Sequence, residues 1–520
     1  MKIKRIILEN FRGYRKKTAI DFNNLTIFVG RNDVGKSTVL EALDLFFNEG
    51  KGAVKCDKGD LPVGSGAKEC TVSVVFSELP QEVVLDDSVE TSLSEEYLLN
   101  KDGDLEIVKR FNGSKCSDIR IRAWHPTNPE CSDLLQKKQK ELQEIIKKSG
   151  IPHEDMKANP VMRKAIWRHF GENLECKETE IGVDKEDAKR IWEKLQTYLP
   201  VYSLFRADRE NTDGDSAVQD PMKSAAEQFL KDVETQKQLN EIAEKVRKQL
   251  QEVVDRTVEA LRGMDPKVAD GLKPVIPSVD KLKWADVFKN VSVTGQDDIP
   301  LNKRGSGVKR LVLISFFKAE AERRQRYKNT GIIYAIEEPE TSQHFENQRI
   351  LAKALKDLSE APGTQVQVIV TTHGNVMVKA LGETKNIRLI SDGEDGTKAV
   401  EPVTSGLLGY PSLNEINYTA FGAVTEEYHD ELWGYLEEHG YVKVKPEDGE
   451  YDKEQMEKGN VKDYIKVKEG KIFEPKPTSL SHYIRDQIHH PENKFNKRFT
   501  PEDLKKSVEE VREFIKAHRA

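Results

Sequence analysis

The sequence predicts an α/β fold with compact helical insertions and a mostly α C-terminal module. Three observations support this class. Short apolar runs at 25–29, 332–336 and 366–370 have the character of fully buried parallel strands. The segments 134–198 and 220–261 are rich in Lys, Glu, Gln and Leu, which favours helices. Beyond about residue 400 the pattern changes to scattered helices around an acidic, lysine-rich stretch.

These changes of pattern divide the 520 residues into four parts. We expect one lobe of the α/β core at 1–125 and helical insertions at 126–262, with a short core segment near 200–210. The second lobe is expected at 263–400 and the C-terminal module at 401–520. A protruding coiled coil of about 100 residues per arm has no room in the insertions, which are therefore predicted to be compact.

Composition restricts the compartment and the partners. The formal net charge is −7 and 33% of the residues are charged, so contact with nucleic acid requires a local basic patch. No stretch approaches the ~20 apolar residues that cross a bilayer, and residues 1–10 alternate charged with apolar side chains. The five cysteines are widely spaced and form no C-x-x-C pair, which is typical of free thiols. We expect a cytoplasmic protein without a membrane partner.

The first motif follows a strand expected at 2–8 and the apolar strand at 25–29. Residues 30–37 match the pattern G-x-x-x-x-G-K-[ST] and precede a helix that begins near Ser37. Backbone N–H groups of such a loop wrap phosphates, Lys36 would neutralise the β- and γ-phosphates of ATP, and Ser37 would coordinate Mg²⁺. The predicted nucleotide-binding residues here are Gly30, Arg31, Asn32, Asp33, Gly35, Lys36, Ser37 and Thr38.

The second motif is a cluster of carboxylates at the end of the strand at 332–336. Glu337, Glu338 and Glu340 stand close together in the sequence Glu-Glu-Pro-Glu. Carboxylates held together repel one another unless a cation pairs them, which favours a metal site. We predict that Glu337 holds Mg²⁺ through water and that Glu338 is the general base that polarises the attacking water.

The third motif is Thr-Thr-His at 371–373, directly after the strand at 366–370. Ligands gather at the carboxyl ends of parallel strands, and a neutral imidazole can donate a hydrogen bond to a phosphate oxygen near pH 7. We therefore predict that His373 contacts the γ-phosphate and add it to the catalytic residues.

The fourth motif is the loop Gly305, Ser306 and Gly307, flanked by cations and followed by an apolar segment at 311–317. Small residues at a helix N-terminus bind anions. Gly/Ser loops also commonly precede the N-termini of helices that bind no ligand, so this loop alone is weak evidence for a nucleotide site.

Together, these motifs and Asn-Phe-Arg-Gly-Tyr at 10–14 resemble the RecF, SMC and OLD branch of ABC ATPases. The resemblance implies an ABC-type P-loop ATPase core that uses ATP and Mg²⁺. It also implies that Gly305, Ser306 and Gly307 reach across a dimer to ATP held by the partner's P-loop. Gln343 and His344 fall where that family's D-loop crosses the dimer axis.

Within that branch, the chain resembles anti-phage ATPases related to OLD, including those of the Septu, Gabija, PARIS and retron-associated systems. The segments at 412–422 and 483–493 are similar to parts of Septu ATPases of the PtuA kind, which work beside a separate HNH nuclease. No Toprim signature follows residue 400. The resemblance implies a homodimer or higher homo-oligomer that regulates a separate HNH or Toprim nuclease.

Two alternatives remain open. Arg485 and His490 match the spacing of HEPN ribonucleases, in which paired Arg and His groups stabilise a phosphoryl transition state and move the 2′-OH proton. The preferred interpretation of the same segment is a polar helix end that docks a partner or has a structural role, because a single short match is weak evidence for a ribonuclease. The other alternative is a DNA-repair ATPase of the RecF kind, with nucleic acid as a candidate partner.

Overall fold

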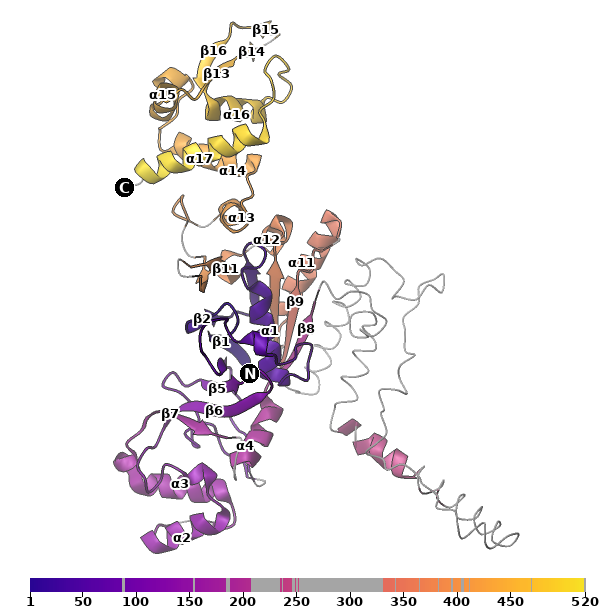
Figure 1. The fold of residues 1–520 in the computed structure, drawn as a ribbon, viewed down its shortest axis with the longest axis vertical. Coiled ribbons are helices and arrows are strands. Elements are labelled where there is room, and N and C mark those ends of the chain that lie inside the picture. The colour runs from indigo at the N-terminus through magenta and orange to yellow at the C-terminus, as the bar shows by residue number, and fades with distance from the viewer. Residues whose placement is uncertain are drawn as a thin grey trace, which may run out of the picture. The chain divides into compact units, whose positions relative to one another are not determined.

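The computed structural model describes residues 1–86, 89–152, 155–183, 188–206, 331–341, 343–363, 365–381, 383–393, 396–403, 406–410, 412–468 and 470–518, with parts of 234–251. The chain divides into two compact units. The first comprises Met1–Phe205, Ala321–Thr341 and Phe345–Ala520, and the second comprises Arg206–Glu320 and Ser342–His344. The description below concerns the first unit (Figure 1).

A mainly parallel sheet with strand order β12-β11-β3-β10-β9-β8 forms the centre of this unit (Figure 1). Strands β11, β3, β10, β9 and β8 are parallel, and β12 is antiparallel at one edge. The predicted buried parallel strands are confirmed, since β3, β9 and β10 lie side by side. The strands are β3 (Leu25–Val29), β8 (Val201–Phe205), β9 (Ile332–Glu337), β10 (Val366–Thr372), β11 (Ile387–Asp392) and β12 (Lys398–Pro402).

Three helices belong to this α/β layer. Helix α1 (Lys36–Asn48) follows β3 and contacts β8. Helix α11 (Phe345–Ser359) contacts β10 and α12 (Asn375–Leu381), and the short η7 (Thr384–Asn386) leads into β11. Because β3 and β10 are buried along their whole length, their continuous apolar sequences fit the centre of the sheet.

A second sheet is antiparallel, with strand order β2-β1-β4-β5-β6-β7. It shares one hydrophobic core with α1, in which the rings of Phe46 and Phe76 lie 6.2 Å apart. A short helix η1 (Lys58–Asp60) precedes β4. The strands are β1 (Lys2–Glu9), β2 (Thr18–Asp21), β4 (Cys70–Ser77), β5 (Leu105–Phe111), β6 (Cys116–His125) and β7 (Lys177–Gly182).

The described part of the insertion at 126–205 contributes buried apolar residues to the core of the antiparallel sheet. It contains η2 (Leu134–Gln136), α2 (Gln139–Ser149), α3 (Asn159–Phe170), η3 (Gly171–Leu174), α4 (Ala188–Leu195) and η4 (Gln196–Tyr198). It is not entirely helical, because β7 pairs with β6 at the edge of the antiparallel sheet. The Glu180 carboxylate of β7 lies 2.6 Å from Arg110 and 2.8 Å from Arg122, two cations on neighbouring strands that favour this edge position.

The C-terminal module has its own hydrophobic core, in which Tyr428, Trp433 and Tyr451 pack against Val508 and Phe514. Its helices are α13 (Leu413–Phe421), α14 (Glu426–Glu438), η8 (Pro446–Asp448), α15 (Glu450–Glu457), α16 (Leu480–His489) and α17 (Pro501–His518). Four short strands add two small ladders: β13 (Val461–Tyr464) with β16 (Lys476–Ser479), and β14 (Val467–Lys468) with β15 (Lys471–Ile472).

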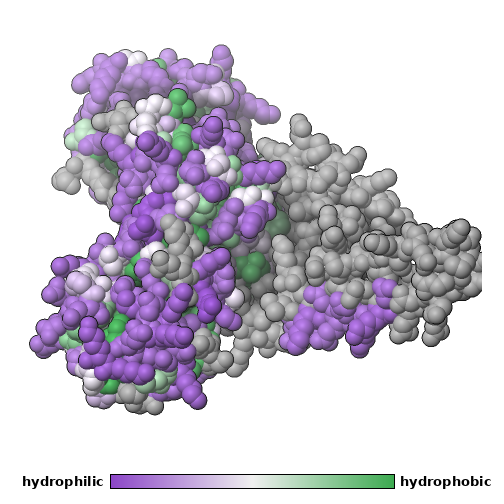
Figure 2. Space-filling model, turned by 60° about the horizontal axis from the view of Figure 1, so that its bottom comes forward, coloured by the Kyte–Doolittle hydropathy of each residue, from purple (hydrophilic) through white to green (hydrophobic). Residues whose placement is uncertain are grey.

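The described surface is mainly hydrophilic on the face that Figure 2 shows. Within the described ranges, the helices are too short or too polar for any of them to cross a bilayer.

Candidate functional site

The loop between β3 and α1 has the conformation that a phosphate-binding loop requires. Gly30 has φ 153° and Gly35 has φ 98°, values that side chains disfavour. A Cβ atom on Gly30 would lie 2.5 Å from the Ile390 carbonyl oxygen, so only glycine fits there. Asp33 also has a positive φ of 62°. Alternating backbone conformations of this kind turn successive N–H groups toward one anion.

Lys36 opens helix α1 and is enclosed by this loop, with 5% of its surface exposed. Its Nζ donates to the carbonyl oxygens of Gly30 at 2.9 Å and Arg31 at 2.8 Å. Burial lowers the pKa of Lys36, while nearby carboxylates, Glu338 first among them, act in the opposite direction. The side chain is therefore a positive charge held in place by the loop.

Glu337 and Ser37 are 300 residues apart in the chain and meet at the carboxyl edge of the sheet. The register explains the meeting, because Thr372 of β10 pairs with Val29, and Thr371 pairs with Glu337. The Ser37 hydroxyl donates a hydrogen bond to the Glu337 carboxylate. A hydroxyl beside a carboxylate supplies the hard oxygen ligands that Mg²⁺ prefers. The buried Glu340 Oε2 has no hydrogen-bond partner among the described residues, so an acceptor for metal-bound water is also present. These residues fit a Mg²⁺ ion.

Glu338 and His373 also come together at this edge. His373 Nδ1 lies 3.1 Å from Glu338 Oε1, and the imidazole is 43% exposed. Glu338 has φ 42°, a left-handed conformation that is costly for a residue with a side chain. Its backbone N–H donates to the Thr371 carbonyl at 2.9 Å, which holds this turn against β10. The sharp turn carries the Glu338 carboxylate out of the strand direction and places it beside His373.

Glu340 has a positioning role that the sequence did not indicate. Its buried Oε1 accepts from the Thr372 hydroxyl at 2.5 Å and from the His373 backbone N–H at 3.0 Å. Glu340 therefore fixes the loop that carries His373. The cluster of carboxylates in the sequence indicated a site. The sequence could not show that Glu340 accepts from the backbone of the loop that follows β10.

Tyr14 and Lys398 support the phosphate loop from other parts of the chain. The Tyr14 hydroxyl donates to the Gly35 carbonyl at 3.1 Å, and burial raises the pKa of Tyr14, so the hydroxyl keeps its proton. Lys398 Nζ donates to the Asp33 carbonyl at 3.3 Å and pairs with Asp392. No sequence signal links Lys398 to a loop that lies 365 residues away.

Other predicted site residues lie outside the described ranges, in the second unit, or in the C-terminal module. Gly305, Ser306 and Gly307 lie outside the described residues. Gln343 and His344 belong to the second compact unit. Arg485 and His490 lie at helix α16, where Arg485 is 3.0 Å from Asp486 and 3.3 Å from Glu437. His490 lies 3.3 Å from Glu492, so these two cations have separate acidic neighbours.

A glycine-rich loop before a helix, a lysine enclosed by it, and carboxylates at the ends of adjacent parallel strands define a P-loop ATPase. The family model described as AAA ATPase domain matches residues 1–378. The chain belongs to this family and is an ATPase.

The chain is also similar to a chromosome condensation protein and to solved SMC head structures. It is 29% identical over 155 residues to the chromosome condensation protein dpy-27 of Caenorhabditis elegans, an alignment that spans 29% of this chain and 9% of that protein. Among solved structures, one match is a Smc head bound to the C-winged helix domain of ScpA. The matched region spans 77% of this chain and 97% of the Smc head chain, with 17% identity and a TM-score of 0.36. The match to the SMC head domain from Thermotoga maritima spans 77% of this chain and 99% of that domain's chain, with 13% identity and a TM-score of 0.30.

Proposed function

We propose that this ATPase is a cytoplasmic, Mg²⁺-dependent regulator of the ABC type. Its nucleotide state would control a separate nuclease in bacterial anti-phage defence. The observation that carries the ATPase part is the meeting of Lys36, Ser37, Glu337, Glu338 and His373 at one edge of the sheet. The regulatory part rests on the resemblance of the motifs to OLD-related and PtuA-like ATPases.

The site residues divide the work of hydrolysis. Lys36 and the loop N–H groups bind the phosphates, and Ser37 and Glu337 hold Mg²⁺, which when bound neutralises phosphate charge. Glu338 accepts a proton from the attacking water. His373, whose Nδ1 lies 3.1 Å from Glu338, donates its N–H toward the γ-phosphate. Glu340 and Tyr14 contact the loops and position these groups without touching the substrate.

In this proposal, two copies of the chain build each ATP site together, and the residues described above supply one half of it. Gly305, Ser306 and Gly307 of one copy complete the ATP site of the other, as the resemblance implies, and Gln343 and His344 lie near the dimer axis. ATP would then join two copies, and hydrolysis would release them. The nucleotide state of each copy would therefore determine whether the dimer is closed or open.

The C-terminal module would bind the effector. Exposed apolar side chains gather on its β14–β15 ladder and beside it: Val467 is 37% exposed, Ile472 57% and Phe473 48%. Lys466, Lys468 and Lys471 of the same segment are also exposed, as is the acidic residue Glu474. Apolar residues rimmed by charges are typical of protein interfaces. This ladder therefore suits an effector with an apolar patch and an acidic rim.

The proposal is tested by purifying the full chain together with an HNH or Toprim protein encoded beside it and measuring the mass of the complex. We expect a defined complex that the double variant Ile472→Asp, Phe473→Asp weakens at least tenfold. The control is Val63→Asp, since Val63 is 91% exposed and lies outside the C-terminal module. Failure to co-purify, or equal loss in the control, would overturn the effector part and leave the ATPase site untouched.

A further inference from the structure

The insertion contains a large cavity, lined mostly by polar and charged residues, at some distance in sequence from the ATPase motifs. Its volume is 1520 Å³, and its lining comes from η2, the first turn of α2, the start of α3, and the α4–η4 segment. None of its described lining residues is aromatic. A cavity of this size and polarity is unlike an apolar pocket for a small ligand.

Unpaired cations line this cavity. Lys138, Lys140, Arg190 and Lys194 are exposed, and within the described ranges none of them makes an ion pair. Arg190 and Lys194 are four residues apart on α4 and so share one face, where like charges destabilise a helix by a few tenths of a kcal/mol. An anionic ligand would remove this repulsion.

The acidic residues of the lining offset these charges only in part, because Glu141 and Glu193 are the two lining carboxylates without a cationic partner in the described ranges. Asp86 is occupied by Arg163, with Nη1 at 2.7 Å and Nη2 at 3.2 Å. Glu141 caps helix α2 by accepting from the Lys138 backbone N–H at 2.7 Å. Glu193 lies beside Lys194 in the chain but forms no ion pair with a described residue. The fifth cation, Lys137, is paired with Asp133 at 2.8 Å.

The fold holds these cations in place by burying the opposite helix faces. Leu142 and Ile146 of α2 are buried, as are Ile191 and Leu195 of α4. The basic side chains are consequently fixed on the outer faces. The segment 134–170 has nine Lys and Arg against four Asp and Glu, in a chain of net charge −7. The positive charge of the insertion is therefore concentrated in 134–170, because residues 126–205 as a whole have 14 Lys and Arg and 14 Asp and Glu.

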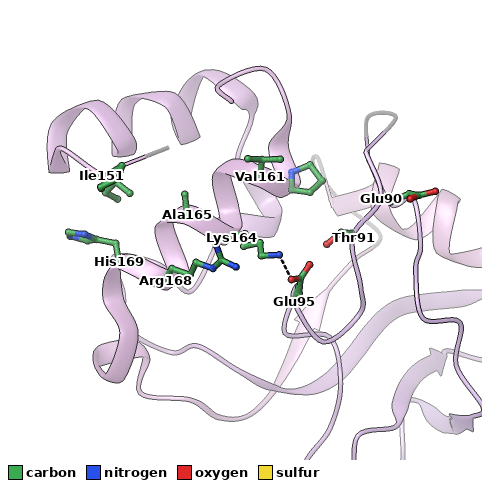
Figure 3. A pocket seen from close by; sticks show the side chains of 11 residues that line it. Glu90, Thr91, Glu95, Ile151, Val161, Lys164, Ala165, Arg168 and His169 are labelled. Carbon is green, nitrogen blue, oxygen red and sulfur yellow. Dashed lines mark hydrogen bonds and ion pairs between the residues drawn. The ribbon is translucent and has the colours of Figure 1, made fainter. Parts of the chain in front are cut away.

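A neighbouring cavity of the insertion shows the contrast (Figure 3). There Lys164 forms an ion pair with Glu95, and Glu90 also lines the wall. Arg168 is the other cation of that lining. Its cations and carboxylates are equal in number, so that cavity has no comparable excess of positive charge.

We propose that the cavity with the four unpaired cations, Lys138, Lys140, Arg190 and Lys194, binds the sugar-phosphate backbone of duplex DNA. Closely spaced cations on fixed helices attract a chain of phosphates. Proteins that hold single strands add aromatic side chains on which bases stack, and the described lining has none. Contacts are therefore to phosphates, without sequence preference. The proposal goes beyond the ATPase and effector functions and does not depend on them.

The test is a titration of a fluorescent 30-base-pair DNA duplex with the full chain at increasing KCl concentrations. The test variant replaces Lys138, Lys140, Arg190 and Lys194 by Gln. We expect its dissociation constant at 100 mM KCl to rise at least tenfold. The slope of log K against log[KCl] should fall by about 3 to 4, because each phosphate contact contributes about 0.9.

The control variant replaces four other exposed lysines, Lys68, Lys353, Lys453 and Lys516, by Gln, since these make no ion pair within the described ranges and do not belong to the proposed effector surface. The control variant has the same net charge as the test variant and should bind the duplex within about twofold of the wild type. The proposal would be overturned if both variants lost the same affinity for the duplex, or if the test variant bound the duplex like the wild type. It would also be overturned if the wild type did not bind the duplex at 50 mM KCl. Tighter binding of single-stranded RNA, duplex RNA or polyglutamate than of the DNA duplex would overturn it as well. Circular dichroism confirms folding, and ATP affinity checks separately that the nucleotide site is intact.

Discussion

Lys36 combines burial with a positive charge, which only a counter-charge or several acceptors can stabilise. Its two loop carbonyl contacts supply acceptors, but the ordinary partner of such a lysine in a P-loop is a phosphate. Removing the ammonium group leaves phosphate charge uncompensated. The residue is thus the simplest point at which to test the nucleotide site.

We predict that Lys36→Ala weakens ATP binding by about 10- to 150-fold, because a hydrogen bond to a charged group contributes about 1.5–3 kcal/mol. Isothermal titration with ATP and Mg²⁺ measures this change. The control Lys68→Ala removes an exposed lysine and should bind ATP like the wild type. Equal affinities of Lys36→Ala and the wild type would reject the P-loop assignment.

Glu338 and Glu337 are adjacent but have different surroundings. Glu337 accepts from Ser37, whereas Glu338 lies beside His373. We predict that Glu338→Gln keeps ATP and Mg²⁺ binding but slows hydrolysis about 10²- to 10⁴-fold, because it removes the general base. The measurement is single-turnover hydrolysis alongside ATP binding. Near wild-type hydrolysis in Glu338→Gln, with none in Glu337→Gln, would mean that the two roles are exchanged.

The sequence predicted Lys36, Ser37, Glu337, Glu338 and His373 because short motifs at strand ends require particular side chains. It could not predict Glu340, Tyr14 or Lys398 as supports. Their roles depend on which loops the sheet order brings together, and Lys398 reaches the Asp33 carbonyl only because β12 and β11 stand beside β3. The sequence thus identified residues that meet at this edge of the sheet, and their chemical roles stay predictions, whereas the supporting contacts could not be identified from it.

At the scale of elements, continuous apolar runs predicted β3, β9 and β10 well, since a strand buried on both faces needs little else. Strand β7 was missed because its residues 177–182 are mostly polar. Its edge position is favoured by ion pairs from Glu180 to Arg110 and Arg122, which are distant in sequence. The four short strands of the C-terminal module were missed for a related reason, since two- to four-residue strands have no readable period.

Buried polar groups join three helices of the C-terminal module. His429 Nε2 of α14 lies 2.9 Å from the Ser507 hydroxyl of α17, which donates to the Ser481 hydroxyl of α16 at 2.7 Å. His429 Nδ1 is buried without a partner in the described chain. Burial, reinforced by the nearby His489, lowers the pKa of His429 to about 3. The imidazole is therefore neutral in the folded module at physiological pH.

We predict that the module loses stability as the pH falls from about 6.5 toward 3. In that window the unfolded histidine, with a pKa near 6.5, binds a proton that the folded one excludes. The stability contribution is fully present above about pH 6.5 and falls by at most about 1.4 kcal/mol per pH unit. Hydrogen exchange of α14 and α17 between pH 7.5 and 5 measures it.

The matched variants for this prediction are His429→Gln, which keeps an amide for Ser507 but does not titrate, and His490→Gln at an exposed position. His429→Gln should flatten the pH dependence, and His490→Gln should leave it unchanged. The same pH dependence in His429→Gln as in the wild type would show that other groups cause it.

At the scale of the whole molecule, the account depends on two copies sharing each ATP site. The P-loop lies near the start of the sequence, and Ser306 follows much later. The resemblance assigns Ser306 to the ATP site of the partner copy. Ser306→Arg would place a bulky cation at the shared interface. It should leave ATP binding by the single chain intact while abolishing dimer closure and hydrolysis.

The measurement that tests this claim most directly is the ATPase rate of mixtures of Ser306→Arg and Lys36→Ala at different ratios. A heterodimer of the two has one composite site with both parts unmutated. The account therefore predicts that intermediate mixtures hydrolyse ATP while either variant alone does not, with heterodimer formation verified by mass. Full activity of the Ser306→Arg variant alone would contradict the shared site.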